Sequence, residues 1–494
     1  MLRKAAADCG VDPRAVTVSV VALDGLRMPE GGRMPVVRPL LAVNADRSVA
    51  PASTAKLVTT LAGLELLGAD WKWRTGFYAK ARPDAEGRVN GIWLRGGGDP
   101  TLVAEKFGLL VERMAQMGVR RIEGDLTVDR SYFDLPEGDP SAFDGRGSRP
   151  YNQLPDAAVA ATGKLDGYQA VFAVLATLLD EGDEILVPDP VWLNYINVPN
   201  LLSGLEVPST IRLSRGACGD WKSTIGYRLE HLSDGRLAAR FEGSLPLSCG
   251  PKTFSVVSLS QNEYLERLFR WYWERDGRTW TGHVAEGRVP EGALKLAERE
   301  SDALPVVTTL VNKWSNNLIA RHIFLTLGTL RNAPDEADSG SRTAGGAFAP
   351  MERPRPGVDT DDARAVLAGW LAEKGVPDGA VMIDNGSGLS RTSRVTARAM
   401  TQILAAGWLS PRMTEYAASL PVSGVDGTMR KRLEATGRTH LKTGYLQDVR
   451  SIGGYVYAKN GRRYALYASV HGERNMAGGI RFLDKVVEWT YLQK

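Results

Sequence analysis

The sequence has little cysteine, little histidine and no long apolar run. Its 494 residues include only 3 cysteines and 5 histidines. Three thiols are too few for a disulfide-dense scaffold or a four-thiolate zinc site, and the histidines form no His-x-x-x-His pair of a zincin-type centre. No apolar stretch reaches the roughly 18 residues of a membrane-spanning helix. We therefore expect no metal site and no transmembrane segment.

A large excess of charge is also absent. The chain has 61 Lys and Arg against 57 Asp and Glu, a formal net charge of +4. That excess is too small to indicate nucleic acid or an anionic membrane as the main partner. Hydrophobic residues make up 43% and charged residues 24%, as in ordinary globular proteins. The length predicts two or three domains.

The first ten residues lack the features of an export signal. They contain no apolar core of about 7 to 15 residues, and Asp8 stands where such a signal is hydrophobic. Two interpretations stay open: a cytoplasmic chain, or a numbering that begins after a signal was removed.

Hydrophobic periodicity predicts both strands and helices. Apolar residues alternate over 16–22, the period of a strand, whereas leucines recur at helical spacing over 53–68. Strands are expected within 15–45, 73–130, 205–260, 440–446 and 452–471, and helices over 53–68, 102–117, 304–327, 361–374 and 479–492. The stretch 331–358, rich in Pro, Gly, Ser and Ala, is typical of a long loop.

The first candidate for a catalytic motif is Ser53-Thr54-Ala55-Lys56. If a helix starts at Ser53, the hydroxyl of Ser53 and the amine of Lys56 lie on one face, one turn apart. A serine hydroxyl becomes a good nucleophile when a base accepts its proton, and a lysine of lowered pKa can be that base. The same tetrapeptide is equally compatible with a solvated helix start, since Ser-x-x-Lys is common by composition.

A second cation would lower the pKa of Lys56, and Lys442-Thr443-Gly444 offers one on a predicted strand. Gly444 would let a ligand approach the backbone closely. A proton relay needs a third element, for which Ser315-Asn316-Asn317 supplies a hydroxyl and an amide. Ser260-Gln261-Asn262 has the same Ser-x-Asn spacing. We favour Ser315 because it lies between the other two motifs in the chain and an apolar helical face follows it.

The ordered set Ser-x-x-Lys, Ser-x-Asn and Lys-Thr-Gly is the signature of penicillin-binding proteins and serine β-lactamases. With it the chain resembles the peptidase S13 family of low-molecular-mass penicillin-binding proteins, the class C D-alanyl-D-alanine carboxypeptidase/endopeptidases. The likeness covers most of the chain and includes the segments 51–60, 96–102, 124–129, 218–221, 384–391 and 426–428.

The resemblance implies an α/β (α+β) fold of several domains. A β-lactamase/transpeptidase-like catalytic domain, an antiparallel sheet flanked by helices, is expected from 1–70 and 301–494. Two smaller β-rich domains would interrupt it, one from 71–160 with 262–300 and one from 161–261. Ser53 and Lys442 are far apart in the sequence, yet the chemistry requires them to meet.

The activity implied is a serine-type D-Ala-D-Ala carboxypeptidase or endopeptidase that acts on peptidoglycan peptides and reacts with β-lactams. Lys56 would take the proton of Ser53, whose oxygen attacks the substrate carbonyl. Ser315, held near Lys56 and Lys442, would pass a proton to the leaving amine, and Asn317 would bind the substrate amide. No metal or organic cofactor is needed. The location implied is periplasmic or otherwise extracytoplasmic, and the oligomeric state stays open.

The substrate carboxylate would face Lys442 and the Thr443 hydroxyl, beside Gly444. Backbone N–H groups of Ser53 and Tyr445 would form the oxyanion hole. Position 445 departs from the family, which usually has Thr or Ser there. The backbone N–H survives this change, but a small hydroxyl is lost or displaced, which puts carboxypeptidase specificity in question more than acylation.

A second departure lies near residues 160–195. This segment resembles the helix–loop–strand around the cofactor of fold-type I pyridoxal-phosphate aminotransferases. No matching Schiff-base lysine segment or phosphate-binding arginine motif accompanies it, so we infer no aminotransferase activity. A pyridoxal-phosphate enzyme is a minor alternative.

Cys218 and Cys249 flank a strand-rich stretch. In an exported protein they could bridge, as the resemblance implies, with about 3–4 kcal/mol of loop-closure stabilisation. Two buried free thiols are the alternative, and Cys9 is left over. Two further functions stay open: a β-lactamase or esterase of the same fold, and a non-catalytic cell-wall scaffold.

Overall fold

The computed structural model describes most of the chain. The described residues are 2–28, 34–147, 149–158, 205–206, 209–219, 221, 224–231, 237–250, 260–331, 357–433 and 439–493. Most of the expected loop 331–358 and the whole aminotransferase-like segment 160–195 lie outside them.

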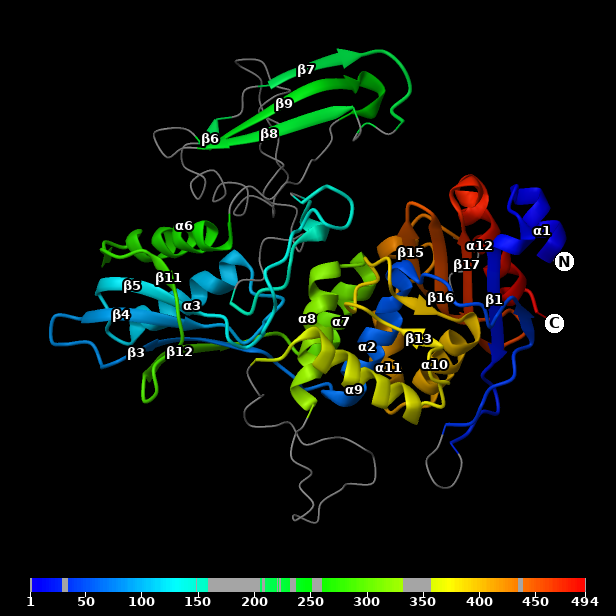
Figure 1. The fold of residues 1–494 in the computed structure, drawn as a ribbon, viewed down its shortest axis with the longest axis horizontal. Coiled ribbons are helices and arrows are strands. Elements are labelled where there is room, and N and C mark those ends of the chain that lie inside the picture. Colours follow the sequence, from blue (N-terminus) through cyan, green and yellow to red (C-terminus); the bar gives the residue numbers. More distant parts are fainter. Residues whose placement is uncertain are drawn as a thin grey trace, which may run out of the picture.

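The main sheet has five antiparallel strands from the two ends of the chain (Figure 1). In spatial order they are β15 (Thr439–Leu446), β16 (Val449–Tyr457), β17 (Arg463–His471), β1 (Val16–Ala22) and β2 (Leu41–Val43). The stretch expected to contain strands over 452–471 belongs to two of them, β16 and β17, because the chain reverses at a turn in which Gly461 has a φ of 84°. Strand β1 joins the N-terminal part of the chain to the C-terminal hairpins.

Helices cover both faces of this sheet. On one face α12 (Met476–Tyr491) packs Phe482 into a cluster with Val18 of β1. The short helix α1 (Leu2–Cys9), which the sequence did not predict, buries Ala6 in the same cluster. On the other face α10 (Ala397–Leu409) contacts β1, where Oγ of Ser19 lies 2.7 Å from Oγ1 of Thr401. Strand β1 is therefore buried on both sides.

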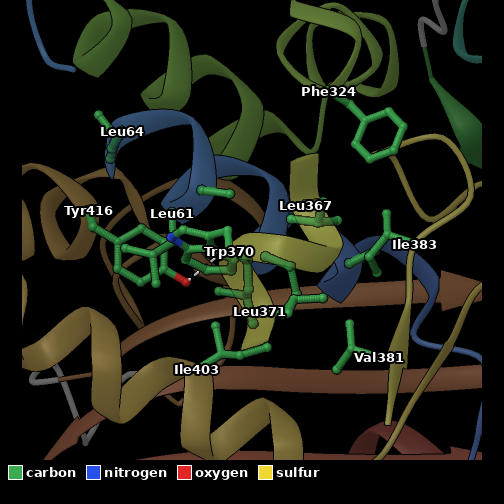
Figure 2. Packing of buried hydrophobic residues seen from close by; sticks show 14 of the residues in the cluster. Leu61, Leu64, Phe324, Leu367, Trp370, Leu371, Val381, Ile383, Ile403 and Tyr416 are labelled. Atoms are coloured by element: carbon green, nitrogen blue, oxygen red, sulfur yellow. Dashed lines mark hydrogen bonds between the residues drawn. The ribbon is translucent and has the colours of Figure 1, made fainter. Parts of the chain in front are cut away.

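The central helix is α2 (Ala55–Leu66), which follows a 3₁₀ turn, η2 (Ala52–Thr54). Leu57, Val58 and Leu61 have no solvent-exposed area. Figure 2 shows Leu61 among side chains from α9 (Thr360–Glu373), α10 and α11 (Met413–Ser419). A helix packed on so many sides cannot shift, so its N-terminal turn holds Ser53 and Lys56 in place.

The single helix expected over 304–327 is wrong. The structure has two helices, α7 (Leu304–Trp314) and α8 (Asn317–Leu327). Between them Ser315 adopts the left-handed conformation, with φ 58° and ψ 36°, which no helix can continue through. Asn316 then caps α8, its Oδ1 accepting from the N–H of Ile319 at 3.0 Å. The break falls in the Ser-x-Asn motif.

Two further sheets are formed by residues that lie in the sequence between α2 and α7 (Figure 1). The first comprises β3 (Arg74–Ala79), β4 (Arg88–Arg95), β5 (Arg121–Asp129), β10 (Thr279–Trp280), β11 (Val284–Glu286) and β12 (Leu294–Glu300), with helices α3 (Ala104–Gln116) and α6 (Gln261–Glu274). The second comprises β6 (Leu205–Glu206), β7 (Ser209–Ser214), β8 (Ile225–His231) and β9 (Leu237–Pro246). A two-stranded pair, β13 (Val381–Met382) and β14 (Arg394–Val395), precedes α10. A disulfide joins Cys218 to Cys249, and Cys9 is free and buried.

Among the described helices, none has the length and apolarity needed to cross a bilayer.

Candidate active site

The residues of the three sequence motifs meet at one place. Nζ of Lys56 lies 3.0 Å from Oγ of Ser53 and 2.7 Å from Oδ1 of Asn317. Nζ of Lys442 lies 2.9 Å from Oγ of Ser315. The η2–α2 turn, the break between α7 and α8, and strand β15 therefore supply two hydrogen-bonded groups, close enough for the charge of Lys442 to act on Lys56. Ser260, the alternative start of a Ser-x-Asn motif, instead caps α6 with a capping box.

The contacts of Lys56 specify which of its neighbours could give it a proton. Besides Ser53 and Asn317, the ammonium group contacts the carbonyl oxygen of Ser387 at 2.5 Å. The amide oxygen of Asn317 and the carbonyl oxygen of Ser387 can only accept hydrogen bonds. A neutral Lys56 would direct its two hydrogens to these oxygens, and its lone pair would face the hydroxyl of Ser53. This is the arrangement of a general base beside a nucleophile.

Both active-site lysines are fully buried, and burial disfavours their charged forms. The pKa of Lys56 lies well below its ordinary value, chiefly because of burial, with added repulsion from Lys442 and Arg321. Burial lowers the pKa of Lys442 to about 7. The lowered pKa favours the neutral form of Lys56, which is the form that the base beside Ser53 must have.

A strained turn presents Ser53. Ala52 has a φ of 50°, a left-handed conformation that alanine rarely adopts, directly before the candidate nucleophile. The carbonyl oxygen of Pro51 accepts from Oγ1 of Thr54 at 2.5 Å and from Oγ of Ser451 at 2.7 Å. The first bond lies within the turn and the second ties it to the adjacent strand β16, so the surrounding structure holds the strained residue in place.

Gly444 allows the Lys-Thr-Gly strand to approach this turn. A Cβ at position 444 would overlap Oγ of Ser451, lie 2.9 Å from the carbonyl oxygen of Pro51 and 3.1 Å from Cβ of Ala52. The close approach expected at Gly444 is therefore an approach of the chain itself, not only of a ligand. It sets the distance between β15 and Ser53.

The loop before β14 supplies a contact that the sequence did not predict. The chain passes close to Ala52 at Gly388 and close to Phe324 at Gly386, both with positive φ, and a Cβ at either position would overlap its neighbour. Between them, Ser387 presents its carbonyl oxygen to Lys56. The alternation of glycines in Asn385-Gly386-Ser387-Gly388 was the available signal of such a close approach.

Helix α8 also holds a segment from the inserted region against the site. Nδ2 of Asn317 donates to the carbonyl oxygen of Tyr151 at 3.1 Å, and Nη1 of Arg321 donates to that of Gln153 at 3.0 Å. Asn317, expected to bind a substrate amide, thus already bridges Lys56 and Tyr151. Arg321, one turn further along the helix, was missed because a lone arginine in an apolar helix carries no motif.

Tyr445 lies exposed at the end of β15, with 64% of its surface accessible. Its ring centroid is 3.4 Å from Cζ of Arg450, the residue paired with it across the β15–β16 hairpin. Two residues earlier, Oγ1 of Thr443 donates to Oγ1 of Thr428 at 2.8 Å. The strand therefore presents an aromatic ring on a guanidinium, and beside it a pair of hydroxyls.

Comparison with known proteins identifies the family. The sequence model of the D-Ala-D-Ala carboxypeptidase 3 (S13) family matches residues 36–488. The chain belongs to this family. The assignment confirms the enzyme class predicted from the sequence, a serine-type D-Ala-D-Ala carboxypeptidase, and the predicted β-lactamase/transpeptidase-like multidomain fold.

Two curated S13-type relatives align along most of the chain. The D-alanyl-D-alanine carboxypeptidase of Actinomadura sp. (strain R39) is 30% identical over 430 residues, 83% of this chain and 71% of that protein. The D-alanyl-D-alanine carboxypeptidase DacB of Haemophilus influenzae is 21% identical over 434 residues, 87% of this chain and 82% of that protein.

A solved structure shows the same fold. Penicillin binding protein 4 (dacB) from Haemophilus influenzae superposes with a TM-score of 0.68 at 18% identity, covering 100% of this chain and 99% of that one. The same protein complexed with a β-lactam gives a TM-score of 0.66 at 17% identity, with the same coverage.

The likeness to aminotransferases also appears among curated proteins. The aspartate aminotransferase of Streptomyces avermitilis is 30% identical over 145 residues, 28% of this chain and 30% of that protein. Because the match covers less than a third of either protein, it does not indicate aminotransferase activity in this chain.

Proposed function

We propose that this S13 enzyme cleaves the D-Ala-D-Ala bond of peptidoglycan peptides through an acyl-enzyme on Ser53. The observation that carries the proposal is the contact set of Lys56, whose two acceptor-only neighbours leave Ser53 as the proton source. The same acyl transfer accounts for reaction with β-lactams, whose strained amide is attacked by the same hydroxyl.

In the acylation step Lys56 removes the proton of Ser53 as the serine oxygen attacks the substrate carbonyl. The backbone N–H groups of Ser53 and Tyr445 stabilise the oxyanion, with about 3–4 kcal/mol per donor as a typical contribution. The approach of Gly444 to the Pro51–Ala52 turn supports this geometry, because it brings the β15 backbone beside the nucleophile.

The leaving amine takes its proton from Ser315. Oγ of Ser315 accepts from Nζ of Lys442, so the hydroxyl proton of the serine is available to a third group. Lys442 carries a pKa of about 7, which suits it to exchange protons at neutral pH. The proton that Lys56 took from Ser53 replaces the one that Ser315 gave to the amine, which returns Lys56 to its neutral form. Water then attacks the acyl-enzyme with Lys56 again as the base, and Ser53 regains a proton as the shortened peptide leaves.

The inserted region contributes to the site through residues 150–153. Support comes from the bonds of Asn317 and Arg321 to Tyr151 and Gln153, which place this segment beside Lys56. The proposed domain division stays that of the sequence: 1–70 with 301–494, 71–160 with 262–300, and 161–261. The enzyme acts outside the cytoplasm, where peptidoglycan lies and where a disulfide such as Cys218–Cys249 persists.

Intact mass after incubation with benzylpenicillin tests the proposal. We expect the mass to rise by one penicillin in the wild type and not in Ser53→Ala. Release of the adduct over many minutes is expected of a peptidase, whereas release within seconds would identify a β-lactamase. A mass increase that persists in Ser53→Ala would overturn the assignment of Ser53, and cellular effects that survive this substitution would favour a scaffold.

A further inference from the structure

The Asp426-Gly427-Thr428 segment has no part in the chemistry above, yet it is built against the active site. Oδ2 of Asp426 accepts from Nζ of Lys313 at 2.6 Å, and Oδ1 accepts from the N–H of Val422 at 2.8 Å. Lys313 also donates to the carbonyl oxygen of Leu420 at 2.7 Å. Because Lys313 lies in the last turn of α7, these bonds tie the segment to the helix end that precedes Ser315.

Gly427 makes the close approach possible. It has a φ of 54°, and a Cβ there would lie 2.7 Å from the carbonyl oxygen of Lys313 and 3.1 Å from its Cα. Any other residue would push the segment away from α7. The 3₁₀ turn η7 (Gly427–Met429) that starts here turns Thr428 towards β15 and buries Met429 beneath it.

Thr428 then meets the Lys-Thr-Gly strand. Its Oγ1 accepts a hydrogen bond from Oγ1 of Thr443 at 2.8 Å, and its side chain is exposed. A hydroxyl has one proton to donate. That of Thr428 has no acceptor among the described residues, so it faces solvent at a point one residue from Lys442. The two hydroxyls together therefore have one free proton, that of Thr428, to donate to a ligand.

The other neighbour on this face of β15 offers no small hydroxyl. Thr443 and Tyr445 lie two residues apart and so share one face of the strand. The ring of Tyr445 rests on the guanidinium of Arg450. Thr428, from a different part of the chain, completes a pair of small hydroxyls with Thr443 on this face.

We propose that Thr428 is a substrate-binding residue, whose hydroxyl is oriented by the hydrogen bond from Thr443 and donates its own proton to the terminal carboxylate of the substrate. A carboxylate has only acceptor oxygens, and a hydrogen bond to an ionised acceptor is stronger than one between neutral groups. The inference rests on the proposed function, since it names a further residue of the same site. It also gives the Asp426-Gly427-Thr428 segment a purpose: Asp426 and Gly427 position the hydroxyl.

The test compares two peptides that differ only at the recognised group. One is an acylated tripeptide that ends in D-Ala-D-Ala with a free carboxylate, and the other is its C-terminal amide. For Thr428→Val we expect kcat/KM on the carboxylate peptide to fall by roughly tenfold or more, the usual effect of losing a hydrogen bond to a charged group. The amide peptide should change little, and Thr428→Ser, which keeps the hydroxyl, should retain the wild-type ratio.

Each other result overturns the inference. An unchanged ratio in Thr428→Val would show that the hydroxyl does not contact the carboxylate, and an equal fall on both peptides would show a structural role. A wild type without preference for the carboxylate would do the same. The proposed function fails separately, when the wild type neither hydrolyses these peptides nor gains mass with benzylpenicillin.

Discussion

Nζ of Lys442 lies 2.9 Å from Oγ of Ser315, although 127 residues separate the two in the chain. Each of the two residues is in an energetically unfavourable state. The lysine is fully buried, and the serine has a left-handed backbone. Both features cost folding free energy, and both place the groups where proton transfer needs them. The site thus holds strain that the surrounding helices must support.

The first prediction concerns the stability cost of Lys442. Its pKa falls from 10.5 to about 7 on folding, so between these values the unfolded chain binds more protons than the folded one. The free energy of unfolding therefore falls as the pH is lowered from 10.5 to about 7. We expect Lys442→Met to raise the melting temperature relative to the wild type more at pH 7 than at pH 10, while acylation is lost. An equal difference at both pH values would contradict the prediction.

The second prediction concerns Arg321 as a positioning residue. Its charge is one of the causes of the low pKa of Lys56. Acylation needs neutral Lys56, so its rate rises with pH through that pKa. Removing the positive charge raises the pKa, and we expect the acid limb of the acylation rate in Arg321→Leu to move to higher pH. Arg321→Lys keeps the charge and is the control, with its limb close to that of the wild type. A limb that moves to lower pH in Arg321→Leu would refute the electrostatic role.

The third prediction compares two glycines. In Gly444→Ala the added Cβ overlaps Ser451 and crowds Pro51, so the strand must move away from the Ser53 turn. We expect at least about a hundredfold loss in the rate of penicillin acylation, comparable to the loss of one oxyanion donor. Gly369→Ala is the matched control, because position 369 is exposed in helix α9 with nothing within 4 Å. It should acylate normally and gain about 0.5–1 kcal/mol of stability. Normal acylation in Gly444→Ala would exclude the proposed spacing.

The fourth prediction concerns stability in acid. His322 is fully buried, its Nδ1 lies 2.9 Å from the carbonyl oxygen of Gly98, and burial lowers its pKa to about 4. Between pH 6.5 and 4 the unfolded chain binds the extra proton, so stability falls as the pH falls through this window, by about 3 kcal/mol at most. Thermal unfolding of His322→Gln should show a smaller loss from pH 7 to pH 4 than the wild type. Equal losses in His322→Gln and the wild type would argue against this account.

The sequence predicted the elements whose periodicity is strong. The helix after Ser53, the terminal helix and the strands around Lys442 are present, with ends that differ by a few residues. The helix over 304–327 was predicted as one element because its apolar face continues on both sides of Ser315. The break depends on a left-handed residue and a side-chain cap at Asn316, which periodicity does not register.

The residues of the candidate site also fall into two groups, those that the sequence predicted and those that it did not. Ser53, Lys56, Ser315, Asn317 and Lys442 belong to short motifs, and motifs can be found in a sequence. Ser387 acts through its backbone carbonyl, so the sequence signals it only through the glycines on either side, and Arg321 acts through its charge and belongs to no motif. Thr428 was visible only as part of a likeness, because a contact with Thr443, 15 residues away, follows no sequence spacing.

The amino-acid order alone determined the chemistry available to this protein: two hydroxyls, two amines and an amide at spacings that suit acyl transfer. Only the tertiary structure decided which of them touch, how far water is excluded from the lysines, and which backbone groups join them. The physical reason is that reactivity here depends on burial and on contacts between segments hundreds of residues apart. Those quantities arise when the sheet and the other helices pack against the central helix.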